Sequence, residues 1–325
     1  MREALFVKQN ATKWELFERT QPRSPDELAD RFIAVTDDLA YAKTFYPKSR
    51  TTAYLNGLAA KLHQSIYRNK REKSRRFISF WQYELPWLFK QHERQLLYAL
   101  IFFVTFCLMG ALSAKYDDTF VRLILGDSYV NMTNDNIEKG DPFGVYKQME
   151  PFEMFFFIAA NNIWVSFVAF ALGIVFSVGT VYVLIRNGIM LGSFQYYFFS
   201  KGLGWDSVLV IWIHGTLEIS AIVIAGAAGL VLGNSFLFPK TYSRMAAFKR
   251  GAKDGLKMVV GLIPIFIAAA FLEGYVTRHT GMPVWLSCAI LAGSLAFIAW
   301  YVVIYPRHLY RSTDSSTPYG TKNNV

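Results

Sequence analysis

Residues 212–233 read WIHGTLEISAIVIAGAAGLVLG, a run in which only His214 and Glu218 are ionisable. An apolar stretch of about 18 residues or more is a candidate transmembrane helix, because about 20 helical residues cross the hydrocarbon core of a bilayer. This run therefore predicts a membrane-spanning helix. It also raises the question of why a histidine and a glutamate lie four residues apart at membrane depth.

The composition of the whole chain agrees with a membrane protein. Hydrophobic residues make up 53% of its 325 residues, and several other runs are long enough to cross a bilayer. Cys107 and Cys288 each lie inside an apolar run, so we expect neither a disulfide framework nor a redox or metal motif. The sequence also lacks a zincin His-Glu-x-x-His, a Gly-x-Ser-x-Gly, a P-loop and a dinucleotide-binding fingerprint. We therefore expect no catalytic residue, no metal and no cofactor.

The formal net charge of +10 is concentrated beside the apolar runs. Of the 34 lysines and arginines, 18 precede residue 95, and six more lie in residues 234–257, where Asp254 is the only acid. Such clustering is typical of cytoplasmic loops in membrane proteins. No nucleic-acid recognition motif accompanies the charge, so we expect the basic residues to contact membrane lipids rather than nucleic acid.

Residues 1–76 predict a helical domain in the cytoplasm. The N-terminus has no apolar segment followed by a small-residue cleavage site, so it is not a secretory signal peptide. Ser24, Pro25 and Glu27 form a capping box with proline at the first helical position, which predicts a helix start. Apolar residues recur at three- and four-residue steps through residues 49–67 and predict a further helix.

Residues 77–94 predict an amphipathic helix in the headgroup region of the membrane. They are rich in aromatic residues and follow a basic run, a combination typical of helices that lie on anionic lipid. A fourth helix of the N-terminal bundle is the alternative. The residues expected at the membrane surface are Arg68, Lys70, Arg71, Lys73, Arg75 and Arg76.

The rest of the chain predicts an all-α, polytopic transmembrane domain over residues 95–305. The expected crossings, about six, are 95–114, 155–188, a short pass over 188–200, 206–233, 256–276 and 284–305. Residues 187–203 either cross or dip and return. The loop 115–154 carries eight acids and four bases, which favours the extracytoplasmic side. Both termini then lie in the cytoplasm, and the polar tail 306–325 is expected to be disordered.

His214 and Glu218 share one helical face within hydrogen-bonding reach of each other. An ionisable side chain at the bilayer centre costs about 2.5–3.5 kcal/mol on insertion scales, so such residues usually pair inside a bundle. Gly215 could loosen the helix at this point and turn backbone groups toward a cavity. The pair fits a buried structural contact, an ion or proton pathway, a partner contact, or a metal site that would need further ligands, and the sequence does not choose among them.

Small residues recur every four positions further along the same run, at Ala225, Gly229 and Gly233. This spacing allows two helices to approach closely, either within the chain or between two copies. Glu273 is a further acid at membrane depth or at its edge, near the outward end of the fifth predicted crossing.

Two stretches resemble the core of the stage II sporulation protein M family of bacterial integral membrane proteins. They are AANNIWVSFVAFALGIVFSVGTVYVLIRNGIMLGSF at residues 159–194 and HGTLEISAIVIAGAAGLVLG at residues 214–233, and FLEGYVT at 271–277 is similar as well. The resemblance extends over about residues 3–305 and implies a bacterial cytoplasmic membrane location. The characteristic positions it implies are Asn161, Asn162, Asn187, Gly188, His214, Gly215, Glu218, Gly226, Gly229 and Glu273.

The resemblance implies a non-enzymatic scaffold, since the family's namesake is similar to a membrane anchor for peptidoglycan-degrading partners. We therefore expect a membrane scaffold, as a homodimer, that recruits protein partners in the membrane or cytoplasm for envelope or peptidoglycan remodelling. The alternative is a transporter or channel for small solutes or ions. It would use His214, Glu218 and Glu273, together with Asn161, Asn162 and Asn187, as a polar pathway through the membrane.

Overall fold

A computed structural model describes the chain except for residues 1, 21, 23–24, 68–74, 280 and 315–325. The chain divides into two compact units, Met1–Arg76 and Phe77–Val325. Within the described residues both units are built from helices, and neither contains a strand. The predicted all-α class is therefore confirmed.

The first unit consists of three helices, α1 (Glu3–Arg19), α2 (Pro25–Phe45) and α3 (Arg50–Tyr67). They enclose an apolar core that includes Phe6, Trp14 and Leu55. The indole nitrogen of Trp14 also donates a 2.7 Å hydrogen bond to Asp38, so a polar contact fixes this ring in the core. The predicted Ser24 cap and the basic residues Arg68 to Lys73 lie outside the described residues.

The second unit begins inside a broken helical segment that consists of α4 (Arg75–Ser79), the π-helix η1 (Phe80–Glu84) and α5 (Leu85–Gln91). Leu85 and Phe89 are fully buried in the core of this unit, whereas Phe77 is 71% exposed. The Trp81 indole donates a 3.1 Å hydrogen bond to the Gly261 carbonyl. The segment therefore packs one face on the long helices of its own unit, and it is no fourth helix of the N-terminal bundle.

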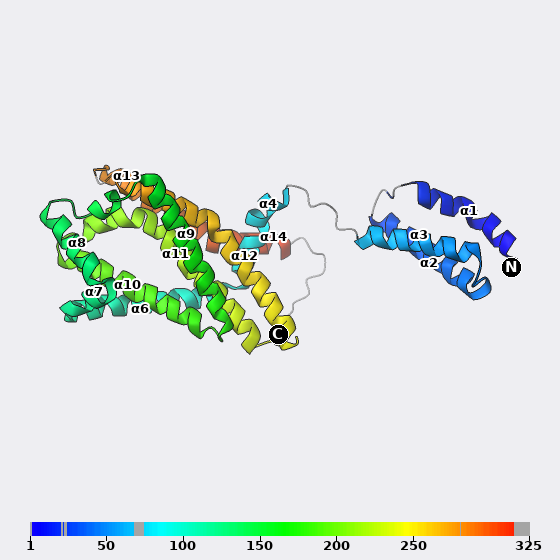
Figure 1. Ribbon diagram of the computed structural model, residues 1–325, viewed down its shortest axis with the longest axis horizontal. Coiled ribbons are helices and arrows are strands. Elements are labelled where there is room, and N and C mark those ends of the chain that lie inside the picture. Colours follow the sequence, from blue (N-terminus) through cyan, green and yellow to red (C-terminus); the bar gives the residue numbers. More distant parts are fainter. Residues whose placement is uncertain (1, 21, 23–24, 68–74, 280, 315–325) are drawn as a thin grey trace. The chain divides into compact units, whose positions relative to one another are not determined.

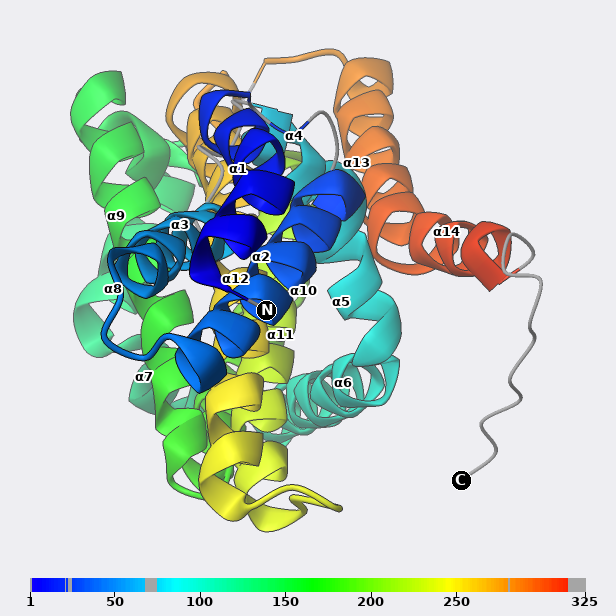
Figure 2. The same cartoon turned by 90° about the vertical axis from the view of Figure 1, so that its right-hand side faces the viewer.

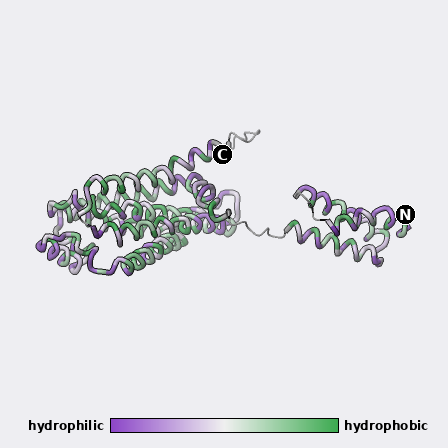
Figure 3. The backbone as a smooth tube through the Cα atoms, turned by 90° about the horizontal axis from the view of Figure 1, so that it is seen from above, coloured by the Kyte–Doolittle hydropathy of each residue, from purple (hydrophilic) through white to green (hydrophobic). Residues whose placement is uncertain are grey.

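In the described part of the second unit, five stretches are long and apolar enough to cross a membrane. Figure 3 shows hydrophobic residues, in green, through the middle of the second unit's helices and hydrophilic residues, in purple, gathered toward its ends. The five stretches contain α6 (Glu93–Tyr116), α9 (Pro151–Ala171) with η3 (Leu172–Ile174), α11 (Gly204–Leu237), α12 (Arg244–Phe271) with η4 (Leu272–Thr277), and α13 (Val284–Ala299) with η5 (Trp300–Ile304) and the start of α14 (Tyr305–Asp314). The chain is thus a polytopic membrane protein by length and composition.

The predicted boundaries of the second and third crossings are wrong. The chain reverses direction after η3, at residues 175–177, where Phe176 and Ser177 have φ of 50° and 67°. It then forms one continuous helix, α10 (Val178–Ser200), which packs along α6 and holds Arg186 near its middle. Residues 188–200 are therefore the second half of α10 and make no separate short pass.

A small helical cap covers one end of the long helices (Figure 1). It is formed by α7 (Asp118–Leu125), α8 (Asp127–Glu138) and the short η2 (Gly144–Lys147), and lies opposite α4 and α14. Hydrogen bonds from Thr119 cap α7 and hold the pKa of Asp117 below its usual range. The tail is not wholly disordered as predicted, because its first residues continue as α14, which leaves the line of α13 (Figure 2).

The small-residue stripe of α11 packs against helices of the same chain. A side chain on Gly229 would collide with Thr180 and lie 2.6 Å from the Ala169 carbonyl oxygen, and one on Gly233 would meet Ser177. The stripe therefore closes α11 on α9, η3 and α10, so this face is occupied and is not free to meet a second copy.

We expect Gly229→Ala to destabilise the protein by about 1–3 kcal/mol, because the added methyl group has no room against backbone and Thr180. Gly215→Ala is the matched control on the same helix. A side chain there would meet only Ile219 at 3.8 Å, so the change is expected to be neutral or to stabilise the helix by up to about 1 kcal/mol. Thermal unfolding in detergent compares the two, and equal melting temperatures would contradict this packing.

Candidate functional site

Three ionisable side chains gather between α11 and η4. His214 and Glu218 lie on α11, and Glu273 lies on η4, a π-helical turn at the end of α12. One ligating atom from each residue lies within 4.8 Å of the others. Single π-helical turns inside longer helices are frequent at functional sites, so the local departure from α-helix at Glu273 agrees with a functional role.

His214 is held by contacts on both ring nitrogens. Its side chain is only 4% exposed, and Nδ1 lies 2.9 Å from the Thr277 hydroxyl, one turn after Glu273. Nε2 lies 3.8 Å from the Glu273 carboxylate. When Nδ1 donates to Thr277, Nε2 is left with a free electron pair directed at the glutamates. A hydrogen bond on the far ring nitrogen is the usual way in which proteins orient a histidine that binds a metal ion.

Glu218 is close to Asn162, which reaches the cluster from α9. Asn162 is 5% exposed, and its amide nitrogen has no hydrogen-bond partner within the described residues. Among the ion pairs of the described residues, none joins a lysine or an arginine to Glu218 or Glu273. The two carboxylates therefore lie beside each other with only a histidine to offset their charge.

Two further residues complete the cluster. Thr277 could have been suggested by its four-residue spacing from Glu273, but nothing singled out Tyr146, which lies in the long loop before α9. The Tyr146 ring stands edge-on to His214 with the ring centroids 5.7 Å apart. Burial raises the pKa of Tyr146, so its hydroxyl stays neutral.

The other predicted polar residues lie apart from the cluster. Asn187 donates a 2.8 Å hydrogen bond to the Val183 carbonyl of its own helix, and Asn161 is exposed with its amide 3.3 Å from Asn162. The predicted loosening at Gly215 is absent, because α11 is continuous from Gly204 to Leu237. Glu218 lies within 4.8 Å of His214, but the polar contacts that His214 makes within the described residues are with Thr277 and Glu273 of η4.

A cavity of about 280 Å³ lies beside the cluster, toward the capped end of the bundle. Thr277 lines this cavity and also contacts His214, so one side chain joins the cavity to the cluster. The other lining residues come from the loop after α8, the start of α11 and the start of α13, and include Asp141, Asp206 and His279. Asp206 makes no ion pair in the part of the chain that the structure describes, so the cavity carries negative charge.

The cluster suits a cation. It offers an imidazole nitrogen, two carboxylates and a hydroxyl, and nitrogen with carboxylate oxygen is a donor set that divalent first-row metal ions accept. Two half-buried carboxylates this close repel each other strongly unless a cation or a proton lies between them. The arrangement can therefore bind a metal ion or exchange protons, and a cation has a polar approach from the cavity.

Comparison with known proteins gives two matches. A family model described as stage II sporulation protein M matches residues 99–278, more than half of the chain. A second, described as a domain of unknown function (DUF8413), matches residues 4–68, within the first unit. No curated protein and no solved structure matches the chain.

Proposed function

The chain belongs to the stage II sporulation protein M family, and from its buried cluster we propose that this member binds a divalent cation and carries it across the membrane. His214, Glu218 and Glu273 would be the ligands, with Thr277 orienting the histidine and Asn162 supporting Glu218. The transported ion would enter from the cavity at the capped end. When no metal is bound, protons would neutralise the two carboxylates.

One observation carries the proposal: within the described residues, two glutamates with a histidine but no lysine or arginine beside them lie between apolar helices and next to a cavity. Each ionisable residue at this depth costs several kcal/mol, and such residues mark ion pathways and proton relays in many membrane proteins. A purely structural contact would not need a second glutamate. The side-chain amide of Asn162 lies close to Glu218 and adds a polar group at the edge of the cluster.

In this proposal the distribution of charged residues decides which end of the protein faces the cytoplasm. The basic residues of 234–257 lie at the end of α11 and the start of α12, and would face the cytoplasm of a bacterium, with both termini on that side. The acidic loop 115–154 and the cavity would face outward. Toward the cytoplasmic end α11 is tightly packed by Gly229 and Gly233, so the site is closed on that side and transport requires these contacts to open.

The test is uptake of divalent cations by proteoliposomes that contain the purified protein. A dye inside the vesicles reports entry of Zn²⁺, Mn²⁺, Fe²⁺ or Ca²⁺, and a second dye reports proton movement. We expect at least one transition-metal ion to enter faster than into protein-free vesicles, with protons leaving, because metal binding displaces protons from its ligands. Absence of uptake for every ion with folded protein would reject transport.

The first unit supports a second candidate, the membrane scaffold. Residues 1–76 form a compact unit with its own core, and no candidate membrane span lies within the described part of it. Such an appended helical unit is suited to docking a protein partner in the cytoplasm. Neither role requires catalysis. In-membrane crosslinking followed by mass spectrometry should then capture a stoichiometric partner or a second copy, and recovery of uncrosslinked protein alone would reject the scaffold.

A further inference from the structure

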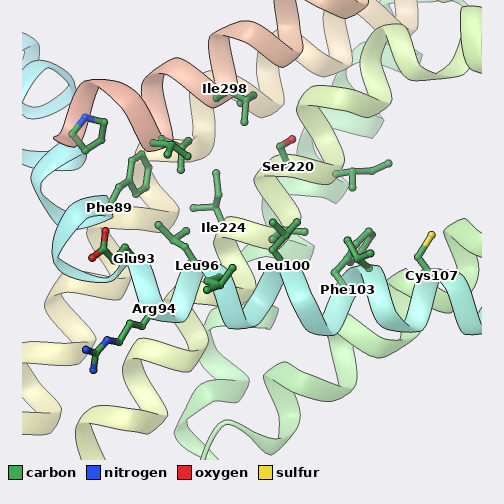
Figure 4. A pocket seen from close by; sticks show the side chains of 18 of the residues that line it. Phe89, Glu93, Arg94, Leu96, Leu100, Phe103, Cys107, Ser220, Ile224 and Ile298 are labelled. Carbon is green, nitrogen blue, oxygen red and sulfur yellow. The ribbon is translucent and has the colours of Figure 1, made fainter. Parts of the chain in front are cut away.

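A long apolar groove runs along the outside of the second unit, away from the polar cluster. Its volume is about 760 Å³, and its walls come from α6 on one side, α13 and η5 on the other, and α11 between them. Figure 4 shows Leu100 on α6 and Ile298 on α13 facing the groove from opposite sides, with Ile224 of α11 between them. Within the bilayer such a groove meets lipid directly.

One end of the groove is charged. Lys90, Glu93, Arg94 and Arg307 line it, and all four lie at the end where α5 meets α6 and α14 begins. Lys90 pairs with Glu93 at 2.6 Å, whereas neither Arg94 nor Arg307 makes an ion pair within the described residues, and both are exposed. Two arginines are therefore available to an anion at this end.

The length of the groove fits one leaflet. From Arg94 to Leu108 the lining residues of α6 cover about 21 Å at the helical rise of about 1.5 Å per residue. One leaflet of the hydrocarbon core is about 15 Å thick, so the groove accommodates an acyl chain with its headgroup at the arginines. Basic pockets between transmembrane helices on the cytoplasmic side bind anionic headgroups in the same way.

We propose that this groove is a binding site for an anionic phospholipid of the cytoplasmic leaflet. The phosphate contacts Arg94 and Arg307, and the acyl chains lie along Leu100, Phe103 and Ile298 between α6 and α13. The charge pattern argues for lipid over a helix of a second copy, because the cations stand only at the headgroup end and the rest of the groove offers little except apolar surface. The lipid would fill the space that separates α13 from α6.

The experiment is native mass spectrometry of the full chain, released from nanodiscs of phosphatidylglycerol mixed with phosphatidylcholine. We expect wild type to retain phosphatidylglycerol selectively. The Arg94→Gln/Arg307→Gln double variant should bind it about 30-fold more weakly, since each basic residue at an anionic surface contributes about a fivefold factor. Arg311→Gln, at the same end but outside the groove, is the matched control and should behave as wild type.

A second variant tests whether lipid binding depends on the groove itself and not only on positive charge at the surface. Ile298→Trp narrows the groove without touching a charge and should also lose retained phosphatidylglycerol, while the protein keeps its melting temperature in detergent. The proposal is overturned if wild type retains phosphatidylglycerol and phosphatidylcholine equally. It is also overturned if the double arginine variant and Ile298→Trp both retain as much phosphatidylglycerol as wild type. If wild type instead forms dimers that retain no lipid, and Ile298→Trp dissociates them, the proposal is overturned and a second copy of the chain occupies the groove.

Discussion

Glu273→Gln is expected to reduce uptake of the transported divalent cation into proteoliposomes by about 100-fold or more, since loss of even an outer-shell partner costs 10–100-fold. The Glu273 carboxylate lies 3.8 Å from Nε2 of His214, and its ligating oxygen lies within 4.8 Å of Glu218. The amide keeps the size of the side chain but removes its charge and one oxygen ligand. Initial uptake rates at several ion concentrations measure the loss.

Glu153→Gln is the matched control for this prediction. Glu153 is an exposed glutamate in the first turn of α9, outside the cluster. Proteoliposomes that contain the Glu153→Gln protein should therefore take up the cation at the wild-type rate. Thr277→Val, which removes only the hydroxyl that orients His214, should give an intermediate loss of about tenfold. A folded Glu273→Gln protein that transports at the wild-type rate would show that the cluster is not the site.

Gly192→Leu is expected to destabilise the protein by about 3 kcal/mol or more, at the top of the usual range for overpacking. Gly188 and Gly192 are four residues apart on α10, at its contact with α6. A side chain on Gly192 would collide with the Cys107 carbonyl, and one on Gly188 would lie 2.7 Å from the Phe103 carbonyl oxygen. Backbone cannot move aside as a side chain can, so leucine has to separate the two helices.

Gly293→Leu provides the control for Gly192→Leu. Gly293 is also helical, in α13, but nothing lies within 4 Å of a side chain built there. It should leave the midpoint of thermal or denaturant unfolding unchanged in the same detergent. A Gly192→Leu protein as stable as Gly293→Leu would contradict the close packing of α6 and α10.

The sequence predicted the membrane domain well where apolar runs end in polar residues. The structure differs from the predicted crossings between residues 155 and 200, where the chain reverses direction inside an apolar run that has no polar break. Phe176 and Ser177 make that turn with positive φ, a conformation that neither residue type favours, and no glycine or proline marks those two positions. The α10 glycines were likewise missed as a packing face, because their neighbours Phe103 and Cys107 belong to a distant helix.

The polar cluster could be predicted only in part. His214 and Glu218 stood out because ionisable residues are rare in an apolar run, and the same reason pointed to Glu273. Which partner each would find depends on how η4 packs against α11, and this is a tertiary contact that spacing does not encode. Asn187 and Asn161 matched the resemblance equally well, yet they lie on other faces of their helices.

The most direct measurement is infrared difference spectroscopy of the reconstituted protein as a divalent cation is added from the capped side. We expect a change in the carboxyl bands in wild type and in Glu153→Gln that is lost in the Glu218→Gln/Glu273→Gln double variant, at a cation concentration that supports uptake. A carboxyl change that persists in the double variant, or no carboxyl change for any cation, would contradict cation binding at His214, Glu218 and Glu273.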